Sequence, residues 1–426
     1  MTESFLHFLW ENKLFSTDEL FTDDGLCVEI VHPGIYNTNA GPDFFNAKLK
    51  IDTTFWAGNV EIHLNSSEWI KHKHHLDLAY DSVILHVVYK NDKSTKRTDG
   101  SHIPTIEIKG RFSLDLWSNF LDLMSQSNWI ACSSYLPTID KALWENVIEE
   151  KCDERLRLKT QNILVALNGL KGNWEECFYQ QLAKNFGFNV NAIPFEMLAR
   201  SLPLKLIHKE RDVIENVVSL LFGQAGMLTP TFSDEYPIDL KERYLHLKNK
   251  YSLRSIQAET WKYMRMRPVN FPTIRIAQFA STLLASNNLF AIARDIKSKN
   301  ELISLLQTGS VNEYWNNHYL FDKPSNKISK NIGLLSIHNL IINTFVPFQF
   351  AWSIYTNNPD YKKSAIQLLK DIPAEKNAIM EKWNRYNIKS HNSFQTQALL
   401  QLKQFHCSEK KCLTCAIGKN LISHKK

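Results

Sequence analysis

The chain has 426 residues, of which 44% are hydrophobic and 22% charged, and its formal net charge is +6. This length allows two or three domains with cores of their own, and the composition is ordinary for a soluble globular protein. The mild positive charge is compatible with nucleic acid but does not require it, since many basic enzymes have the same balance.

The seven cysteines do not resemble the evenly spread framework of a secreted protein, because three of them crowd at the C-terminal end. The first residues lack the basic segment of a secretory signal. The longest apolar stretch, 332–355, contains polar residues that would be costly in lipid, so it predicts a buried helix. We therefore expect a cytoplasmic protein that does not enter a membrane.

The first 112 residues predict a small mixed α/β domain. An amphipathic helix is expected over 1–16 and a second helix over 66–79. Runs rich in β-branched and apolar residues, bounded by turn-forming residues, predict strands. These strands are expected at 27–31, 43–51, 56–64, 82–89 and 104–108.

After residue 112 the pattern becomes helical. Helical periodicity dominates 113–405, interrupted by proline and glycine, and 140–167 predicts one long helix. Residues 406–426 form a cysteine motif followed by a basic tail. The predicted fold class is therefore α+β, with an N-terminal mixed α/β domain followed by a large all-α domain.

Chemistry concentrates in two short segments of the N-terminal domain. Asp43 begins one predicted strand, and Glu61 and His63 lie two residues apart on the next. Alternate residues of a strand point to the same face, so Glu61 and His63 should project together. Carboxylates on adjacent strands beside a base can hold a hard divalent cation next to a phosphodiester.

These motifs resemble the core of the PD-(D/E)XK nuclease superfamily over about the first 110 residues. A longer set of motifs is similar to an uncharacterised bacterial family of unknown function over nearly the whole chain. That set comprises GPDF at 41–44, GNVEIH at 58–63, SSEW at 66–69, HKH at 72–74 and VILHVV at 83–88.

The nuclease resemblance implies that Asp43 and Glu61 bind Mg²⁺ or Mn²⁺. His63 stands where the superfamily has lysine, and it would orient or deprotonate water, or bind a softer ion. On the predicted helix, His72 would assist from a face shared with His75, while His74 would point elsewhere.

An alternative assigns these residues to structure alone. Asp43 would cap a turn, Glu61 would lie on the surface of its strand, and His63 would bond across the sheet. His72 would belong to a solvated helix face, and His86 would be a satisfied core or interface histidine.

A second motif lies at the C-terminal end, where Cys407 is followed by Cys412 and Cys415. A C-x2-C step suits two thiolates on one metal, so zinc or an iron–sulfur cluster is expected. Some PD-(D/E)XK nucleases resemble this layout, with one distant cysteine, and Cys132 is the expected fourth ligand. Other candidates for that ligand are His406, Cys27, Cys152 and Cys177. The alternative is a cluster of reduced, unliganded thiols.

The sequence therefore predicts a metal-dependent nuclease that hydrolyses phosphodiester bonds of nucleic acid, with DNA as the expected partner. The first alternative is a non-catalytic nucleic-acid or protein-binding scaffold with a degenerate site and a structural zinc. A further alternative is a hydrolase of another substrate that acts through zinc bound by histidines.

Overall fold

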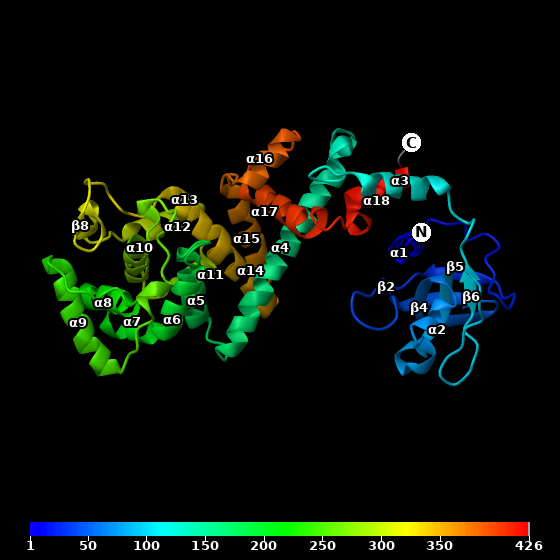
Figure 1. Ribbon diagram of the computed structural model, residues 1–426, viewed down its shortest axis with the longest axis horizontal. Coiled ribbons are helices and arrows are strands. Elements are labelled where there is room, and N and C mark those ends of the chain that lie inside the picture. The colour runs from blue at the N-terminus through cyan, green and yellow to red at the C-terminus, as the bar shows by residue number, and fades with distance from the viewer. Residues whose placement is uncertain (425–426) are drawn as a thin grey trace. The chain divides into compact units, whose positions relative to one another are not determined.

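The computed structural model describes residues 1–424, which form two compact units (Figure 1). The first unit contains residues 1–147 together with the C-terminal segment from residue 402, and the second contains Ile148–Gln401. The segmentation into 1–112, 113–405 and 406–426 stays a prediction, because compact packing alone does not define independently folding domains.

The first unit is built on a mixed sheet with the order β1-β3-β4-β5-β6, in which β2 also pairs with β3. The pairs β1–β3 and β3–β4 are antiparallel, whereas β4–β5 and β5–β6 are parallel. The predicted N-terminal mixed sheet is thereby confirmed. The strands are β1 (Val28–His32), β2 (Ile35–Tyr36), β3 (Phe44–Ile51), β4 (Thr54–Asn65), β5 (Val83–Lys90) and β6 (Thr105–Glu107).

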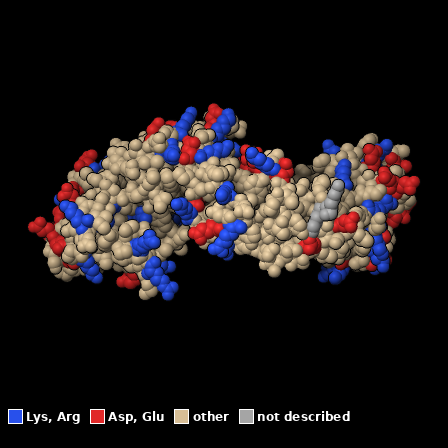
Figure 2. Space-filling model, turned by 90° about the horizontal axis from the view of Figure 1, so that it is seen from above, with Lys and Arg blue, Asp and Glu red and all other residues tan. Residues whose placement is uncertain are grey.

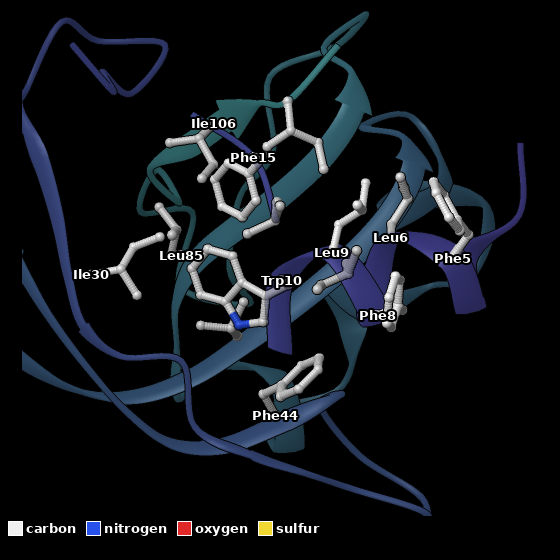
Figure 3. Packing of buried hydrophobic residues seen from close by; sticks show 14 of the residues in the cluster. Phe5, Leu6, Phe8, Leu9, Trp10, Phe15, Ile30, Phe44, Leu85 and Ile106 are labelled. Atoms are coloured by element: carbon white, nitrogen blue, oxygen red, sulfur yellow. The ribbon is translucent and has the colours of Figure 1, made fainter. Parts of the chain in front are cut away.

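Helix α1 (Glu3–Glu11) supplies the core of this unit. The hydroxyl of its N-cap Thr2 accepts a hydrogen bond from the Phe5 backbone, which favours a helix start there. Apolar side chains from α1 gather against the strands, as Figure 3 shows. The helix is shorter than the predicted 1–16, because the chain leaves helical geometry at Lys13, where φ is 50°.

The helix predicted over 66–79 is also corrected. Three short pieces replace it: α2 (Glu68–Lys71) and the 3₁₀ turns η1 (His74–Leu76) and η2 (Leu78–Tyr80). Lys73 adopts the left-handed conformation, with φ 65° and ψ 23°, which ends the helix.

Helix α3 and the C-terminal helix α18 complete the first unit. Ile422 of α18 is fully buried in the same core as Phe120 of α3. The Asn119 side chain donates to the Ile422 carbonyl at 3.1 Å. The remaining elements of this unit are α3 (Leu114–Ser125), η3 (Ser133–Thr138), the π-helical turn η8 (Leu402–Cys407), η9 (Cys412–Thr414) and α18 (Ala416–His424).

The second unit is helical, as predicted, apart from a small hairpin of β7 (His318–Leu320) and β8 (Lys323–Pro324). The long helix α4 (Lys141–Gly169) leads into it. The other helices are α5 (Trp174–Phe186), α6 (Ala192–Ser201), α7 (Leu204–Glu210), α8 (Ile214–Gln224), α9 (Glu235–Tyr251), α10 (Pro272–Ala285), α11 (Leu289–Asp295), α12 (Lys299–Thr308), α13 (Leu334–Leu340), α14 (Val346–Thr356), α15 (Pro359–Asp371), α16 (Ala378–Arg385) and α17 (Ser393–Gln401). Short turns join them at η4 (Ala258–Thr260), η5 (Pro268–Asn270), η6 (Glu313–Asn317) and the π-helical η7 (Ile341–Phe345).

The apolar stretch predicted as a buried helix spans Leu334–Thr356, through α13, η7 and α14. It is long and apolar enough to cross a membrane, as is the bent pair α10–α11 if that pair is counted as one span. However, 72% of the apolar window in Leu334–Thr356 is buried, as in a core helix. On the face shown in Figure 2, acidic and basic side chains are interspersed rather than gathered by sign.

Candidate metal centre

The two predicted carboxylates meet where β3 begins beside β4. The Asp43 backbone N–H donates to Glu61 Oε2 at 3.1 Å, and the Ile62 backbone N–H donates to Asp43 Oδ2 at 2.9 Å. These reciprocal bonds hold each carboxylate against the neighbouring strand. The acids that the sequence pairs therefore lie together as a fixed unit.

Glu61 is buried next to a group that opposes its charge. Its side chain is 7% exposed, and burial, followed by the charge of Asp43, raises its pKa to about 9. A buried carboxylate pair needs either a proton or a cation to offset its charge. The pair is therefore suited to a bound cation.

Two imidazoles lie beside the other oxygen of Glu61, and a third lies against one of them. From Glu61 Oε1, His63 Nε2 lies at 3.6 Å and His74 Nε2 at 3.4 Å. His72 Nδ1 lies 3.2 Å from His63 Nε2, and the ligand atoms of the three histidines are all within 4.8 Å of one another. Ligands at about 2.1 Å around a tetrahedral ion are about 3.4 Å apart, so the three imidazoles fit one transition-metal ion, with Glu61 Oε1 beside His63 and His74.

His74 reaches the site because the chain turns at Lys73. The prediction that His72 and His75 share a face while His74 points elsewhere is wrong, because it assumed a continuous helix. The left-handed residue directs His74 back toward the sheet. There the Tyr80 ring stacks on His74, with the ring centroids 3.8 Å apart.

Burial keeps His63, His74 and His86 in the neutral form, in which an imidazole can bind metal. Burial, reinforced by neighbouring imidazoles, lowers the pKa of His63 to about 2 and that of His86 to about 3. Burial and His72 lower the pKa of His74 to about 4. His63 Nδ1 lies 2.9 Å from His86 Nε2, so His86 fixes the ring from β5.

Several buried imidazole nitrogens around the site have no hydrogen-bond partner among the described residues. They are Nδ1 of His86 and both ring nitrogens of His7. His7 Nε2 is 3.2 Å from Asp43 Oδ2, although the geometry is not that of a hydrogen bond. Buried polar atoms of this kind indicate a site that takes an ion or ordered water. The interpretation of His86 as a core or interface histidine agrees with its burial: Nε2 contacts His63, and Nδ1 has no partner among the described residues.

All four of the predicted catalytic residues, Asp43, Glu61, His63 and His72, lie in this cluster. Sequence reasoning missed His74 and His7. The crowding of six of the chain's fifteen histidines between 63 and 102 pointed toward His74. Nothing in the neighbouring sequence pointed toward His7, which lies on α1.

The site is open on the side of His72, where a pocket is lined by His72, Lys73, Leu76, Asp77 and Leu78.

Comparison with known families gives one match. A family model described as "Protein of unknown function (DUF2851)" covers residues 3–378. The chain belongs to this family. No curated protein and no solved structure matches it. The predicted membership in an uncharacterised family is thereby confirmed.

The DUF2851 match contains the whole histidine–carboxylate cluster and Cys132, but it ends before the three C-terminal cysteines. The structure nevertheless places Cys132 near them. Burial, followed by Cys415 and Cys412, raises the pKa of Cys132 to about 12. Burial also raises the pKa of Cys407, and Cys132 and Cys415 raise it further.

Among the described residues, no three of these four sulfurs lie within 4.8 Å of one another, unlike the ligand atoms of the three histidines. Among the described residues, three ligand atoms lie within 4.8 Å of one another in His63, His72 and His74, and in Asp23, Asp24 and His102, and the cysteines form no such group. Thiolates on one zinc ion are about 3.8 Å apart, given a Zn–S bond of about 2.3 Å. The remaining cysteines, Cys27, Cys152 and Cys177, have no described contact with this set.

Proposed function

We propose that this DUF2851 protein is a metal-dependent hydrolase of phosphodiester bonds in nucleic acid, with DNA as the expected substrate. The observation that carries the proposal is the reciprocally bonded pair Asp43 and Glu61 beside three imidazoles. Its support comes also from the chain order of helix, strands, helix and strand, which resembles the PD-(D/E)XK nucleases. In that resemblance, acids on adjacent strands hold the metal.

The ligand set favours Mn²⁺ or Zn²⁺ over Mg²⁺ at Glu61, His63, His72 and His74, because imidazole suits transition metals and Mg²⁺ prefers oxygen. An ion bound there would acidify a coordinated water and neutralise charge on a phosphoryl oxygen. Asp43 would orient substrate or bind a second cation from the opposite side of Glu61.

His63 would act as a ligand rather than as a replacement for the superfamily's lysine. One ring nitrogen faces Glu61 and the other faces His86, so no nitrogen remains to act as a base. Lys48 and Lys50 do not supply the missing ammonium. They pair across the sheet with Ala57 and Phe55, which lie about 13 Å and 20 Å along β4 from Glu61.

A second candidate function is a non-catalytic nucleic-acid or protein-binding scaffold with a structural zinc. The number of ligands favours it, because structural zinc sites have four protein ligands whereas catalytic sites keep one position open. His72 distinguishes the two functions. It is the exposed member of the set, and a hydrolase would need the position beside it for substrate.

For the cysteines we propose a metal bound by Cys132, Cys407, Cys412 and Cys415. The wide sulfur spacing favours an iron–sulfur cluster over a single zinc ion, because a cluster has its thiolates on separate iron atoms. Absorbance in the visible range, together with iron and sulfide analysis, distinguishes a brown cluster protein from a colourless zinc protein.

The function is tested by incubating the purified protein with single- and double-stranded DNA and RNA in the presence of Mg²⁺, Mn²⁺ or Zn²⁺. Cleavage should require a transition metal and fall at least about 100-fold in Glu61→Gln and Asp43→Asn. Asp18→Asn changes an exposed carboxylate of the same unit outside the cluster, and it should cleave normally.

Cleavage that survives in both site variants would remove the assignment. Stoichiometric metal without cleavage of any of these substrates would favour the scaffold.

A further inference from the structure

One face of the sheet continues beyond the metal centre without a covering element. We propose that this open face of the β3–β4 hairpin binds single-stranded nucleic acid and guides it to the site. This inference rests on the proposed function, because it names the form of substrate that the same site takes.

The pairing register places the residues of this face. Phe55, Ala57 and Asn59 are separated from Glu61 by even numbers of residues along β4, so they share its side of the sheet. Lys50 pairs with Phe55, and Lys48 pairs with Ala57. Directly paired residues point the same way, so both lysines project on the side of Glu61.

Burial changes sharply along this face. At the metal centre Glu61 and His63 are 5% and 2% exposed, whereas Phe55 is 73% exposed. Ala57 and Lys48 are also exposed. An aromatic ring so exposed is unfavourable in water, and it marks a surface on which another group can stack.

The charge on this face suits a phosphate backbone. Among the described residues, neither Lys48 nor Lys50 is within salt-bridge distance of a carboxylate. The Lys50 ammonium lies 5.7 Å from the centre of the Phe55 ring. Glu29 pairs with Lys50 from β1, so the two lysines and this glutamate leave a net charge of +1.

Single-stranded nucleic acid fits this arrangement better than a duplex. A ring that lies on a sheet can stack on a base only when the base is unpaired, and nearby cations follow the backbone. Glu61 lies six residue steps along the strand from Phe55, or about 20 Å, which is the length of a short oligonucleotide. A base on Phe55 would therefore place a phosphodiester several nucleotides away at the metal centre.

The test is binding of a fluorescent oligothymidylate of about twelve nucleotides, within the site size of known single-strand binders. Binding is measured by anisotropy in EDTA, so that cleavage plays no part. Phe55→Ala should weaken binding about tenfold, since one base stack contributes about 1–3 kcal/mol. Phe55→Trp should restore it.

Trp56→Ala is the matched control. Trp56 is the neighbouring residue, is 47% exposed and lies on the opposite face of β4, so its loss should leave binding unchanged.

The lysines are tested by the salt dependence of binding. In the double variant Lys48→Ala/Lys50→Ala, the slope of the logarithm of the binding constant against the logarithm of salt concentration should decrease in magnitude by about 1.4, or about 0.7 for each phosphate contact. Lys90→Ala, an exposed lysine of β5, should keep the wild-type slope.

Equal binding by Phe55→Ala, Trp56→Ala and the wild type would overturn the proposed track, as would preference for a duplex of the same sequence. Either outcome leaves the metal-dependent cleavage assay to decide the proposed function separately.

Discussion

Between Val60 and His63, the two faces of β4 are both buried but chemically opposite. Toward α1, Val60 and Ile62 are 0% and 1% exposed and belong to the apolar core. On the other face, Glu61 and His63 are 5% and 2% exposed and face carboxylate and imidazole groups. Burial alone therefore does not define a core.

The difference separates the face that maintains the fold from the face that we propose binds an ion. Removing apolar side chains from water stabilises a protein, whereas burying ionisable groups without full pairing costs free energy. The face of Glu61 and His63 should therefore gain stability only when an ion is bound, and the opposite face should be indifferent to metal.

The largest expected contrast is in the pH dependence of the metal-free protein. The folded-state pKa values of His63, His74 and His86 lie below the usual 6.5, so the unfolded state binds more protons below that pH and stability falls on acidification. The pKa of Glu61 is raised from 4.5 to about 9, so the folded state holds its proton longer and stability falls as pH rises through that range.

Thermal unfolding followed from pH 4 to 9 should therefore show a maximum near pH 6.5, at the usual histidine pKa. Bound metal keeps Glu61 ionised, so the alkaline decline should disappear on loading with Zn²⁺ or Mn²⁺. An unchanged alkaline limb in the loaded protein would contradict the assignment of Glu61 as a ligand.

The substitution Ile62→Ala disrupts the packing of the apolar face. A buried isoleucine replaced by alanine leaves a cavity and lowers the free energy of unfolding by about 2–5 kcal/mol. Chemical denaturation measures this loss. The same variant should bind one metal ion as the wild type does, and loss of stoichiometric metal in folded Ile62→Ala would show that the two faces are not separate.

The polar face, which contains Glu61 and His63, is tested by a milder substitution. His86→Phe removes the imidazole that contacts His63 Nδ1 while filling a similar volume. Loss of such a supporting contact lowers metal affinity about 10- to 100-fold. Competition with a chromophoric chelator measures the affinity, and an affinity equal to wild type would exclude a supporting role for His86.

The smallest expected effect concerns the left-handed turn at Lys73, which places His74 beside Glu61. Lys73→Val puts a β-branched residue at a positive φ, at a cost of about 1–2 kcal/mol in stability, and it should weaken metal binding. Lys73→Gly accommodates the same φ and should bind metal normally. Equal affinities of the two variants would show that the left-handed turn does not position His74.

The sequence was sufficient for the strands and for the pair Asp43 and Glu61, because strand periodicity is local and fixes which side chains share a face. It was insufficient for His74. One left-handed residue, Lys73, reverses the direction of the side chains that follow, and no periodicity signals such a turn. The contact of His7 with Asp43 depends on the docking of α1 onto the sheet, which joins residues 36 positions apart.

The cysteines also show that the sequence alone does not reveal which residues far apart in the chain come together. The C-x2-C spacing indicates a metal ligand pair, but the choice of Cys132 over Cys152 or Cys177 depends on the return of the C-terminal segment to the first unit. Cys132 and the three C-terminal cysteines belong to that unit, whereas Cys152 and Cys177 belong to the second.

The central claim is one transition-metal ion held by Glu61, His63, His72 and His74. Calorimetric titration of the metal-free protein with Zn²⁺, in parallel with His74→Ala and His75→Ala, tests it most directly. We predict one tight site at the histidine–carboxylate cluster that His74→Ala removes and that His75→Ala, its neighbour in sequence, retains. Equal zinc binding by both variants would contradict the claim.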